Sequence, residues 1–277
     1  SSLPFFSFLC LLLGLSRARI TQSGGHSGGV NGHKDPNWTK ICLNGKKQSP
    51  IDLVTSHAVC QSSIPPLKFE NFDQIGKVLV SNNGETGVID GFHNWTKRPV
   101  FLRELGSRYF LQQIHFHWDM DNKGSEHAVD GKQSAAEMHM VFSLDDMPIH
   151  KAKNKSNGLV VFGVLLEVVP GAELGILRDL VRVGDFDQFE DDKNFNLGTK
   201  MPKNAEYFRY DGSLTTPDCE ENVHWIVFKK PMGMLQSELD ALRQLHDHDK
   251  FNIDHNNRHV TKINGRSVRL YSKSCPK

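Results

Sequence analysis

Three histidines in one stretch of the chain have the residue type and spacing of a metal site. Residues 112–141 read QQIHFHWDMDNKGSEHAVDGKQSAAEMHMV, with His115 and His117 in one alternating run and His139 in a second. Side chains i and i+2 of a strand point to the same side, so His115 and His117 share one space. If the second run pairs beside the first, His139 brings a third imidazole to the same point.

This trio predicts catalytic zinc. Three protein ligands with an open fourth position are typical of catalytic zinc, whereas structural zinc has four ligands, usually cysteines, and no cysteine lies in this stretch. A lone histidine on a strand is more often a core residue, and an H-x-H pair alone leaves the two interpretations about even. The third histidine tips the balance, since a metal-bound histidine usually donates its other N–H to an oxygen, and Glu137 and Gln113 are suitable acceptors.

Further motifs extend this pattern along the chain. Q-x-H-x-H-W, G-S-E-H-x-V-D and A-E-x-H-x-V lie within residues 113–141, and others flank them: Trp38, QSPID (48–52), SNNG (81–84), GSLTTP (212–217), HWIV (224–227) and NGR (264–266). Together they resemble the alpha-class carbonic anhydrases of the secreted type, and the likeness covers nearly the whole chain after its N-terminal segment.

The resemblance implies the fold of that family, an α+β but mainly β domain built on a large twisted, mostly antiparallel sheet with short peripheral helices. The residue pattern agrees with it, because many short alternating segments separated by turn residues predict strands. These segments are 77–81, 100–105, 109–118, 138–143, 159–168, 224–229 and 267–271. Apolar spacing near 3.6 predicts helices over 173–183 and 236–246.

The resemblance also implies the chemistry, reversible hydration of carbon dioxide to bicarbonate and a proton by hydroxide formed on Zn²⁺. His115, His117 and His139 correspond to the zinc ligands. Thr215 corresponds to the residue that orients the nucleophile by donating its hydroxyl proton to Glu126, and Thr216 to a substrate contact. Gln113, Glu137 and the backbone carbonyl of Asn256 correspond to the groups that hold the ligands, and His127 is expected to be structural.

An apolar wall is expected beside the zinc because carbon dioxide is uncharged. The positions that match the family's wall are Val141, Val161, Leu214 and Trp225, with Val223 behind them. Without the resemblance these residues would be read as ordinary core.

Proton release is where the chain departs from the family. Glu85 follows the N-N-G motif, where fast members carry a shuttle histidine. A glutamate titrates near 4.3 against about 7 for water on zinc, so the transfer is uphill by roughly 3.7 kcal/mol, while histidine would make it nearly level. We therefore expect turnover to depend on external buffer, with His93 a weaker candidate shuttle. Ser27–Val30 also lacks the family's solvent-network tyrosine.

The N-terminal region predicts export. Residues 3–15 are apolar but too short to span a bilayer, and they precede a small-residue cleavage pattern. We expect a secretory signal in residues 1–18, its beginning missing, and a flexible Gly/Ser-rich segment in 19–35. The catalytic domain is expected over 36–272, followed by a tail at 273–277. The predicted location is extracellular.

Cysteines and sequons support the same compartment. Outside the signal four cysteines remain, which allows three pairings. The secreted relatives imply Cys42–Cys219, which by subtraction leaves Cys60–Cys275. Sequons begin at Asn37, Asn94 and Asn154.

The charge balance limits the partners. Lys and Arg total 33 against 32 Asp and Glu, and no basic patch of the kind that binds nucleic acid stands out. No second apolar run reaches membrane-spanning length, so the expected partner is the small-molecule substrate; the oligomeric state stays open. A second function class is a carbonic-anhydrase-like extracellular binding or matrix module that has lost catalysis. The three histidines, Glu126 and Thr215 favour the enzyme.

Overall fold

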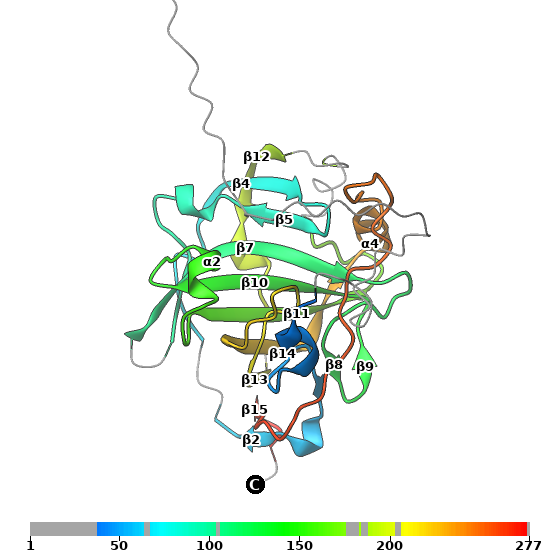
Figure 1. Ribbon diagram of the computed structural model, residues 1–277. Helices are drawn as coiled ribbons and strands as arrows, with labels where there is room; N and C mark the ends of the chain where they lie inside the picture. Colours follow the sequence, from blue (N-terminus) through cyan, green and yellow to red (C-terminus); the bar gives the residue numbers. More distant parts are fainter. Residues whose placement is uncertain are drawn as a thin grey trace, which may run out of the picture.

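One large sheet crosses the molecule and carries its other elements on its faces and edges (Figure 1). The computed structural model describes residues 38–63, 67–103, 106–175, 183, 188–202 and 206–275. Within these residues twelve strands form this sheet, in the order β12-β4-β5-β7-β10-β11-β14-β13-β15-β2, with β6 paired to β7 and β3 paired to β6. Most neighbours are antiparallel, and β11/β14 and β15/β2 are parallel. The predicted fold class is confirmed.

Four long strands form the centre of this sheet. They are β7 (Arg108–Trp118), β10 (Ala136–Leu144), β11 (Leu159–Val168) and β14 (Val223–Met234). All but one residue of β10 are buried, because the strand lies between two others and both its faces are covered. The alternating runs predicted the three-histidine strands, and their antiparallel pairing places His139 directly opposite His115.

The remaining strands extend the sheet on both sides. One side holds β3 (Lys68–Glu70), β4 (Ile75–Asn82), β5 (Gly87–Asp90), β6 (Val100–Leu102) and β12 (Gln188–Asn196). The other side holds β2 (Val59–Gln61), β13 (Tyr207–Gly212) and β15 (Arg269–Tyr271). A small three-stranded sheet is formed by β1 (Asp52–Leu53), β8 (Ala128–Val129) and β9 (Lys132–Gln133).

The helices that the structure describes are short and peripheral, as predicted. Within the described residues they are α1 (Lys40–Asn44), α2 (Ile149–Ala152), α4 (Gln236–Leu242) and the 3-10 turns η1 (Thr55–His57), η2 (Phe92–Asn94) and η5 (Leu197–Thr199). Leu239 and Leu242 of α4 are fully buried, which explains the apolar spacing that predicted this helix. It ends four residues before the predicted boundary. Most of the predicted helix over 173–183 lies outside the described residues.

Two apolar clusters fill the two faces of the sheet. The larger one contains Phe116, Phe142, Phe162 and Ile226, and the smaller one contains Val141, Val161 and Trp225 among its members. Successive residues of one strand alternate between the clusters, so the alternating sequence sorts itself onto two faces. The zinc-site histidines and the smaller cluster therefore share one face of the sheet, since His139 and Val141 are two residues apart.

Long-range connections attach the ends of the domain to the sheet. Disulfides join Cys42 to Cys219 and Cys60 to Cys275, which are the two pairings expected. The guanidinium of Arg258, only 5% exposed, donates to the carbonyls of Cys42 and Ser49 and lies 4.4 Å from the ring centroid of Trp38. Burial lowers the pKa of Arg258 to about 10.

Several sequence-based expectations lie outside the described residues. These are the signal (1–18), the Gly/Ser-rich segment (19–35), Asn37 and the last two residues of the tail. They remain predictions, as do the domain boundaries 36–272 and 273–277.

Candidate metal centre

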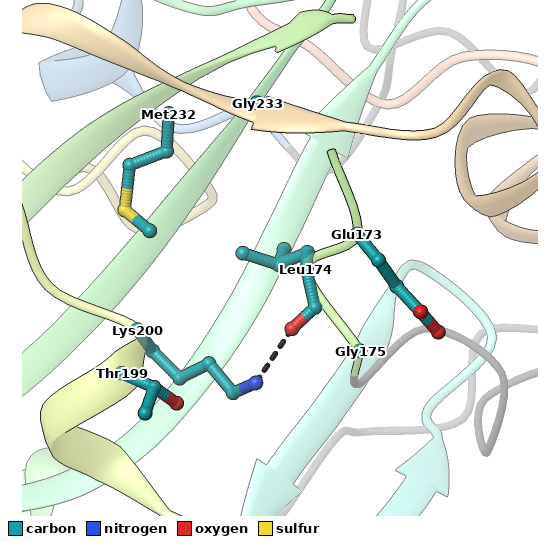
Figure 2. A pocket seen from close by; sticks show the side chains of 7 residues that line it. All are labelled: Glu173, Leu174, Gly175, Thr199, Lys200, Met232 and Gly233. Atoms are coloured by element: carbon teal, nitrogen blue, oxygen red, sulfur yellow. Dashed lines mark hydrogen bonds between the residues drawn. The ribbon is translucent and has the colours of Figure 1, made fainter. Parts of the chain in front are cut away.

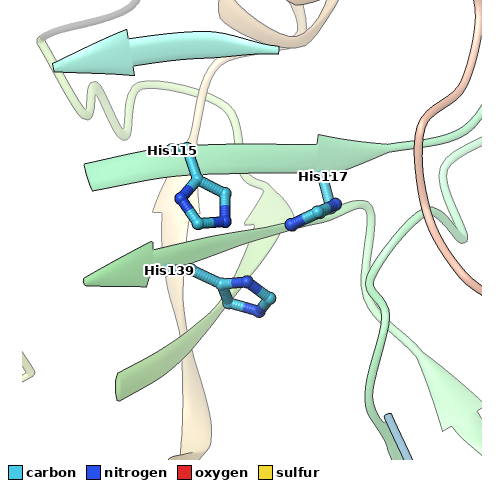
Figure 3. A group of neighbouring side chains, drawn as sticks. All are labelled: His115, His117 and His139. Atoms are coloured by element: carbon cyan, nitrogen blue, oxygen red, sulfur yellow. The ribbon is translucent and has the colours of Figure 1, made fainter. Parts of the chain in front are cut away.

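His115 and His117 of β7 and His139 of β10 bring their imidazoles together over one face of the sheet (Figure 3). One ring nitrogen from each lies within 4.8 Å of those of the other two. The ring centroids are 5.1 Å apart for His115–His117, 5.2 Å for His115–His139 and 4.6 Å for His117–His139. The strand register produces this trio without help from any loop.

Hydrogen bonds on the outer sides of two rings decide which nitrogen faces the centre. Nδ1 of His117 lies 3.1 Å from the Asn256 carbonyl, and Nε2 of His139 lies 2.9 Å from Oε1 of Glu137. If these nitrogens carry the protons, Nε2 of His117 and Nδ1 of His139 are left with lone pairs. Nε2 of His117 is buried and has no hydrogen-bond partner, which fits a nitrogen that binds a metal.

The electrostatics favour neutral imidazoles, the form that binds metal. Burial, followed by the neighbouring rings of His117 and His139, lowers the pKa of His115 well below its usual range. Burial also lowers the pKa of His117. Nitrogen donors from three closely spaced imidazoles, two of them buried and one half-buried, fit Zn²⁺, which binds imidazole readily and accepts three protein ligands with one open position.

Glu137 is the fully buried carboxylate behind His139. Its Oε1 also lies 2.7 Å from Nδ1 of His127, and its Oε2 accepts from the His127 backbone N–H at 2.8 Å. Burial alone would raise the pKa of Glu137, but the facing His127 and His139 lower it well below its usual range. His127, Glu137 and His139 are also close enough to hold a metal. Oε1 of Glu137, however, already lies within hydrogen-bond distance of both histidine rings, so the three residues form a supporting network.

This network continues past His127 and was not predicted. Nε2 of His127 lies 2.6 Å from the hydroxyl of Tyr210, which donates to Oγ of Ser49 at 2.8 Å. Oγ of Ser49 in turn accepts the backbone N–H of Ser213 at 3.1 Å. Ser49 and Ser213 lie in motifs that marked the resemblance, so the signal was present, but their contact could be seen only in the fold.

Glu126 lies beside the trio, 3.4 Å from Nδ1 of His117 and 3.8 Å from Nε2 of His139. Its Oε1 accepts the backbone N–H of Arg258 at 2.9 Å, while Oε2 is buried without a partner. The expected hydrogen bond from Thr215 to Glu126 is therefore not formed in this structure. Thr215 is buried on the Gly212–Cys219 loop, and its hydroxyl direction depends on a side-chain rotamer that the backbone alone does not fix.

Gln113 likewise does not make its expected contact. Nδ1 of His115 is buried and has no hydrogen-bond partner, so no bond from Gln113 holds that ring. Gln113 and His115 are two residues apart on β7, so their side chains point to the same face of the sheet. The hydrogen bond would require only a change in the side-chain torsions of Gln113.

The predicted apolar wall is assembled beside the histidines. Val141, Val161 and Trp225 lie at facing positions on β10, β11 and β14, and each is 2% exposed or less. The ring of Trp225 packs edge-on against His139 with centroids 4.8 Å apart. Leu214 packs against the same cluster, which also contains Val223. Thr216 is half-buried on the loop that carries Thr215.

Comparison with known proteins identifies the family. The sequence model of the eukaryotic-type carbonic anhydrases matches residues 33–272. The chain belongs to this family. Putative carbonic anhydrase 5 of Caenorhabditis elegans is 35% identical over 257 residues, which cover 88% of this chain and 81% of that protein.

Human relatives give the same result. Carbonic anhydrase 7 of Homo sapiens is 31% identical over 88% of this chain and 97% of its own length. Carbonic anhydrase 12 of Homo sapiens is 35% identical over 77% of this chain and 64% of its own length. The chain is thus a carbonic anhydrase, an enzyme of carbon dioxide hydration from a family that is zinc-dependent in general.

Glu85 of this carbonic anhydrase is exposed, and its backbone is tied to the centre. Its carbonyl accepts from Nδ2 of Asn256 at 3.0 Å, and the Asn256 carbonyl faces His117. Asn83 Oδ1 accepts the backbone N–H of Glu85 at 3.0 Å. The Asn-Asn-Gly turn therefore fixes the backbone at position 85 relative to the histidines, whatever side chain stands there.

One surface cavity of this carbonic anhydrase lies elsewhere and does not compete with the three histidines as a catalytic site. It measures about 370 Å³ and is lined by residues that include Glu173, Lys200 and Met232 (Figure 2). Nζ of Lys200 donates to the carbonyl of Leu174 at 2.5 Å, which gives the lysine a structural partner. None of the three histidines lines this cavity.

Other features bear on location. Asn94 and Asn154 are exposed, so both sequons are accessible. In the described part of the chain no helix is both long and apolar enough to cross a membrane.

Proposed function

We propose that this carbonic anhydrase holds Zn²⁺ with His115, His117 and His139 and hydrates carbon dioxide at that centre. The single observation that carries the proposal is the convergence of three imidazoles, two buried and one half-buried, each offering one nitrogen within 4.8 Å of the others. Bound zinc supplies Lewis-acid activation of water, lowering its pKa to about 7, a magnitude established for carbonic anhydrase and not obtained from this structure.

The chain's own residues prepare the ligands. Glu137 and the Asn256 carbonyl hold the outer nitrogens of His139 and His117, and so set the tautomers that leave the inner nitrogens as donors. Glu137 is itself held by two contacts from His127. Rotation of Gln113 would give His115 the same kind of support.

An apolar wall that keeps water away and a set of polar side chains position the substrate. Val141, Val161, Leu214 and Trp225 offer an uncharged wall that suits carbon dioxide and repels water. Thr215 and Glu126 orient the attacking oxygen, because a threonine hydroxyl that donates to the unpartnered Oε2 of Glu126 can only accept from the nucleophile. Thr216 contacts the bicarbonate that forms.

The proton leaves through external buffer. Glu85 stands on the turn from which the family's fast members deliver a histidine, and a glutamate is too acidic to accept a proton readily from a donor with a pKa near 7. The proposal includes an extracellular location with a cleaved signal at 1–18 and glycosylation at Asn37, Asn94 and Asn154. Two disulfides suit an oxidising compartment.

Stopped-flow hydration of carbon dioxide tests the proposal. The rate is measured on the purified protein, after chelation, and after return of Zn²⁺, in a series of buffer concentrations. We expect activity that disappears with the metal, returns with it, and rises with buffer. High activity at all buffer concentrations would refute the buffer route while keeping the zinc enzyme.

The alternative function is an extracellular binding module with a carbonic anhydrase fold and little catalysis. Loss of one or more ligands would favour it, and this chain retains all three histidines, Glu126 and Thr215. A protein that binds one equivalent of zinc and yet hydrates no carbon dioxide would establish the alternative.

A further inference from the structure

Four Asn-Gly pairs lie in the part of the chain that the structure describes, and their surroundings differ. The asparagines are Asn44, Asn83, Asn157 and Asn264, each followed directly by glycine. An asparagine before glycine can lose ammonia spontaneously, because the glycine nitrogen attacks the side-chain amide and no Cβ hinders its approach. The attack needs a nitrogen that is free of hydrogen bonds and room for the chain to bend, so the fold decides which pair reacts.

The glycine nitrogens of the first and third pairs are already engaged. The N–H of Gly45 donates to the Ile41 carbonyl at 2.8 Å. The N–H of Gly158 donates to the Lys155 carbonyl at 2.9 Å. Space is also short, because a Cβ built at Gly45 would lie 2.6 Å from the Ile41 carbonyl oxygen. Neither nitrogen can attack the neighbouring amide without first losing its own hydrogen bond.

The second pair, Asn83 and Gly84, is held at both ends of the reaction. The N–H of Gly84 donates to Oδ1 of Asn82 at 2.9 Å. Oδ1 of Asn83 accepts the backbone N–H groups of Glu85 at 3.0 Å and Thr86 at 2.8 Å. Hydrogen bonds of the turn therefore fix both the attacking nitrogen and the amide that it would attack.

Asn264 and Gly265 occupy the two central positions of an exposed turn. The N–H of Arg266 closes this turn by donating to the Ile263 carbonyl at 3.1 Å. Both central residues have positive φ, 50° for Asn264 and 74° for Gly265. Asparagine and glycine adopt such angles more readily than other residues, which explains why this pair stands here.

The nitrogen of Gly265 differs from the other three glycine nitrogens. It donates no hydrogen bond to any described residue, and a Cβ built at Gly265 would meet nothing within 4 Å. Both Asn264 and Gly265 are exposed. Nδ2 of Asn264 donates to the Lys46 carbonyl at 3.2 Å, an exposed bond for which water competes. Solvent base can thus reach the attacking nitrogen, and a ring has space to form.

We propose that Asn264 is a site of spontaneous deamidation, which converts it into aspartate and isoaspartate. A base in the solvent takes the Gly265 amide proton, and the nitrogen forms a bond to Cγ of Asn264. The bond between Cγ and Nδ2 breaks, ammonia leaves with a proton from the solvent, and a succinimide ring remains. Water then opens the ring. Breaking the bond between Cγ and the ring nitrogen gives aspartate, and breaking the bond between the backbone carbonyl carbon and that nitrogen gives isoaspartate.

The products would disturb an anchor directly after the turn. The guanidinium of Arg266 donates to the carbonyls of Gln48 at 2.7 Å and Asp211 at 3.1 Å. Isoaspartate adds a methylene group to the backbone just before this anchor, and either product adds a negative charge. We therefore expect deamidation to lower the melting temperature. The site does not depend on the zinc chemistry proposed above.

Peptide mass spectrometry after incubation in water labelled with heavy oxygen tests the site. The full-length folded protein is kept at neutral and at mildly alkaline pH and is then digested at mildly acidic pH. We expect the peptide with Asn264 to exchange its amide nitrogen for one heavy oxygen, faster at the higher pH because the attacking nitrogen must lose a proton. Peptides with Asn44, Asn83 and Asn157 should stay unchanged. No exchange at Asn264, or equal exchange at all four sites, would overturn the proposal.

The denatured chain shows whether the fold makes the selection. In denaturant with the disulfides reduced, the hydrogen bonds of Gly45, Gly84 and Gly158 are lost, so all four asparagines should react at similar rates. If Asn264 alone still reacts there, its local sequence is responsible and the structural argument is refuted.

Variants connect the modification to stability. Asn264→Gly removes the amide and supplies a residue that accepts positive φ, so the turn should persist. Asn44→Gln, at an exposed position in a protected pair, is the matched control. During incubation the melting temperature of the wild type and of Asn44→Gln should fall, while that of Asn264→Gly should stay constant. An equal fall in all three proteins would contradict the proposed link between deamidation at Asn264 and loss of stability.

Discussion

At the residue scale, the partner on the far side of each imidazole determines what the ring can do. His117 and His139 are held by a carbonyl and a carboxylate, whereas His127, only one residue after Glu126, is bonded on both ring nitrogens and belongs to the support. The same residue type therefore serves two purposes within a few ångströms. Spacing in the sequence predicted which histidines are ligands and which one is support, but it could not reveal the hydrogen-bonded chain from His127 through Tyr210 to Ser49.

Glu85→His is expected to raise turnover in weak buffer. Proton transfer from the zinc-bound water to a glutamate is uphill by roughly 3.7 kcal/mol, because the two pKa values differ. A histidine titrates near the pKa of the donor, so the same transfer becomes nearly level. Turnover at low buffer should increase by tenfold or more, and the gain should vanish at high buffer, where external base does the work. Stopped-flow hydration over a buffer series measures this.

Glu85→Ala serves as the matched control. It removes the carboxylate without supplying an imidazole, so it should behave like the wild type at every buffer concentration. A gain in Glu85→Ala as large as that in Glu85→His would show that the glutamate obstructs the pocket, and that its pKa is not the limiting property.

At the element scale, β11 has no room for a side chain at the position that faces the metal centre on β10. Gly163 lies opposite His139 in the register, and a Cβ built at this glycine would lie 2.7 Å from Oε1 of Glu137 and 3.3 Å from a methyl group of Val227. Glycine is required here by close approach and not by its backbone angles. The position was not marked by any pattern in the sequence, since its neighbour Glu137 is 26 residues away along the chain.

Gly163→Ala is expected to weaken both folding and zinc binding. Overpacking of this kind costs about 1–3 kcal/mol, and displacement of a carboxylate behind a metal ligand lowers metal affinity about 10–100-fold. Denaturant unfolding and competition with a zinc chelator measure the two effects. Adding Glu137→Asp, which shortens the side chain, should restore part of the stability. If the double variant loses as much stability as the two single variants added together, the proposed contact is contradicted.

The carboxylate of Glu206 gives β13 and the C-terminal segment a dependence on pH. It accepts from the Ser272 hydroxyl and from the Lys273 backbone N–H at 3.1 Å, and the first of these contacts is the main cause of its lowered pKa. Because the folded pKa lies below the unfolded value of about 4.5, this contribution to stability is present above pH 4.5 and is lost as pH falls through the folded pKa.

Glu206→Gln should therefore unfold with a weaker pH dependence than the wild type between about pH 5 and 3. Urea unfolding at several pH values in this window measures the difference. Asp73→Asn, a change of the same kind at another site, provides the comparison. Identical pH slopes for Glu206→Gln and the wild type would show that the Glu206 contacts do not contribute.

The sequence pattern predicted the long central strands better than it predicted the strands beside them. The sequence pattern located β11 with its bounds and β7 and β10 within one or two residues, because successive side chains of a strand point to opposite faces and apolar residues recur on each face that is buried. It missed β12, whose sequence QFEDDKNFN is mostly charged and polar, and β13, which is short. Of these two, β12 is an edge strand, and edge strands need less apolar sequence, so pattern alone does not find it.

At the scale of the whole molecule, residues from distant parts of the chain contact the Gly212–Cys219 loop and the residues next to it. Cys219 of this loop is bonded to Cys42, 177 residues earlier, and Lys153 lies 2.8 Å from both Asp218 and Glu220. The family resemblance implied the first of these connections. The contact of Lys153 could not be foreseen, because it depends on how α2 is placed against the loop.

Replacing both Cys42 and Cys219 with serine should destabilise the protein and also reduce activity. Loss of a native disulfide typically costs about 2–5 kcal/mol, and here it also releases the loop that carries Thr215. Replacing Cys60 and Cys275, which connect β2 to the C-terminal segment, should lower stability and leave activity per folded molecule unchanged. Melting temperatures and hydration rates measured below the transition separate these effects. Equal activity losses in the two pairs would contradict the loop argument.

The central claim is that His115, His117 and His139 together hold the catalytic zinc. Crystals of the protein prepared with Zn²⁺, measured above and below the zinc absorption edge, test it most directly. The account predicts one strong anomalous peak among the three imidazoles, which is lost in His117→Ala. A peak between His127 and Glu137, or zinc only at the surface while hydration activity persists, would contradict it.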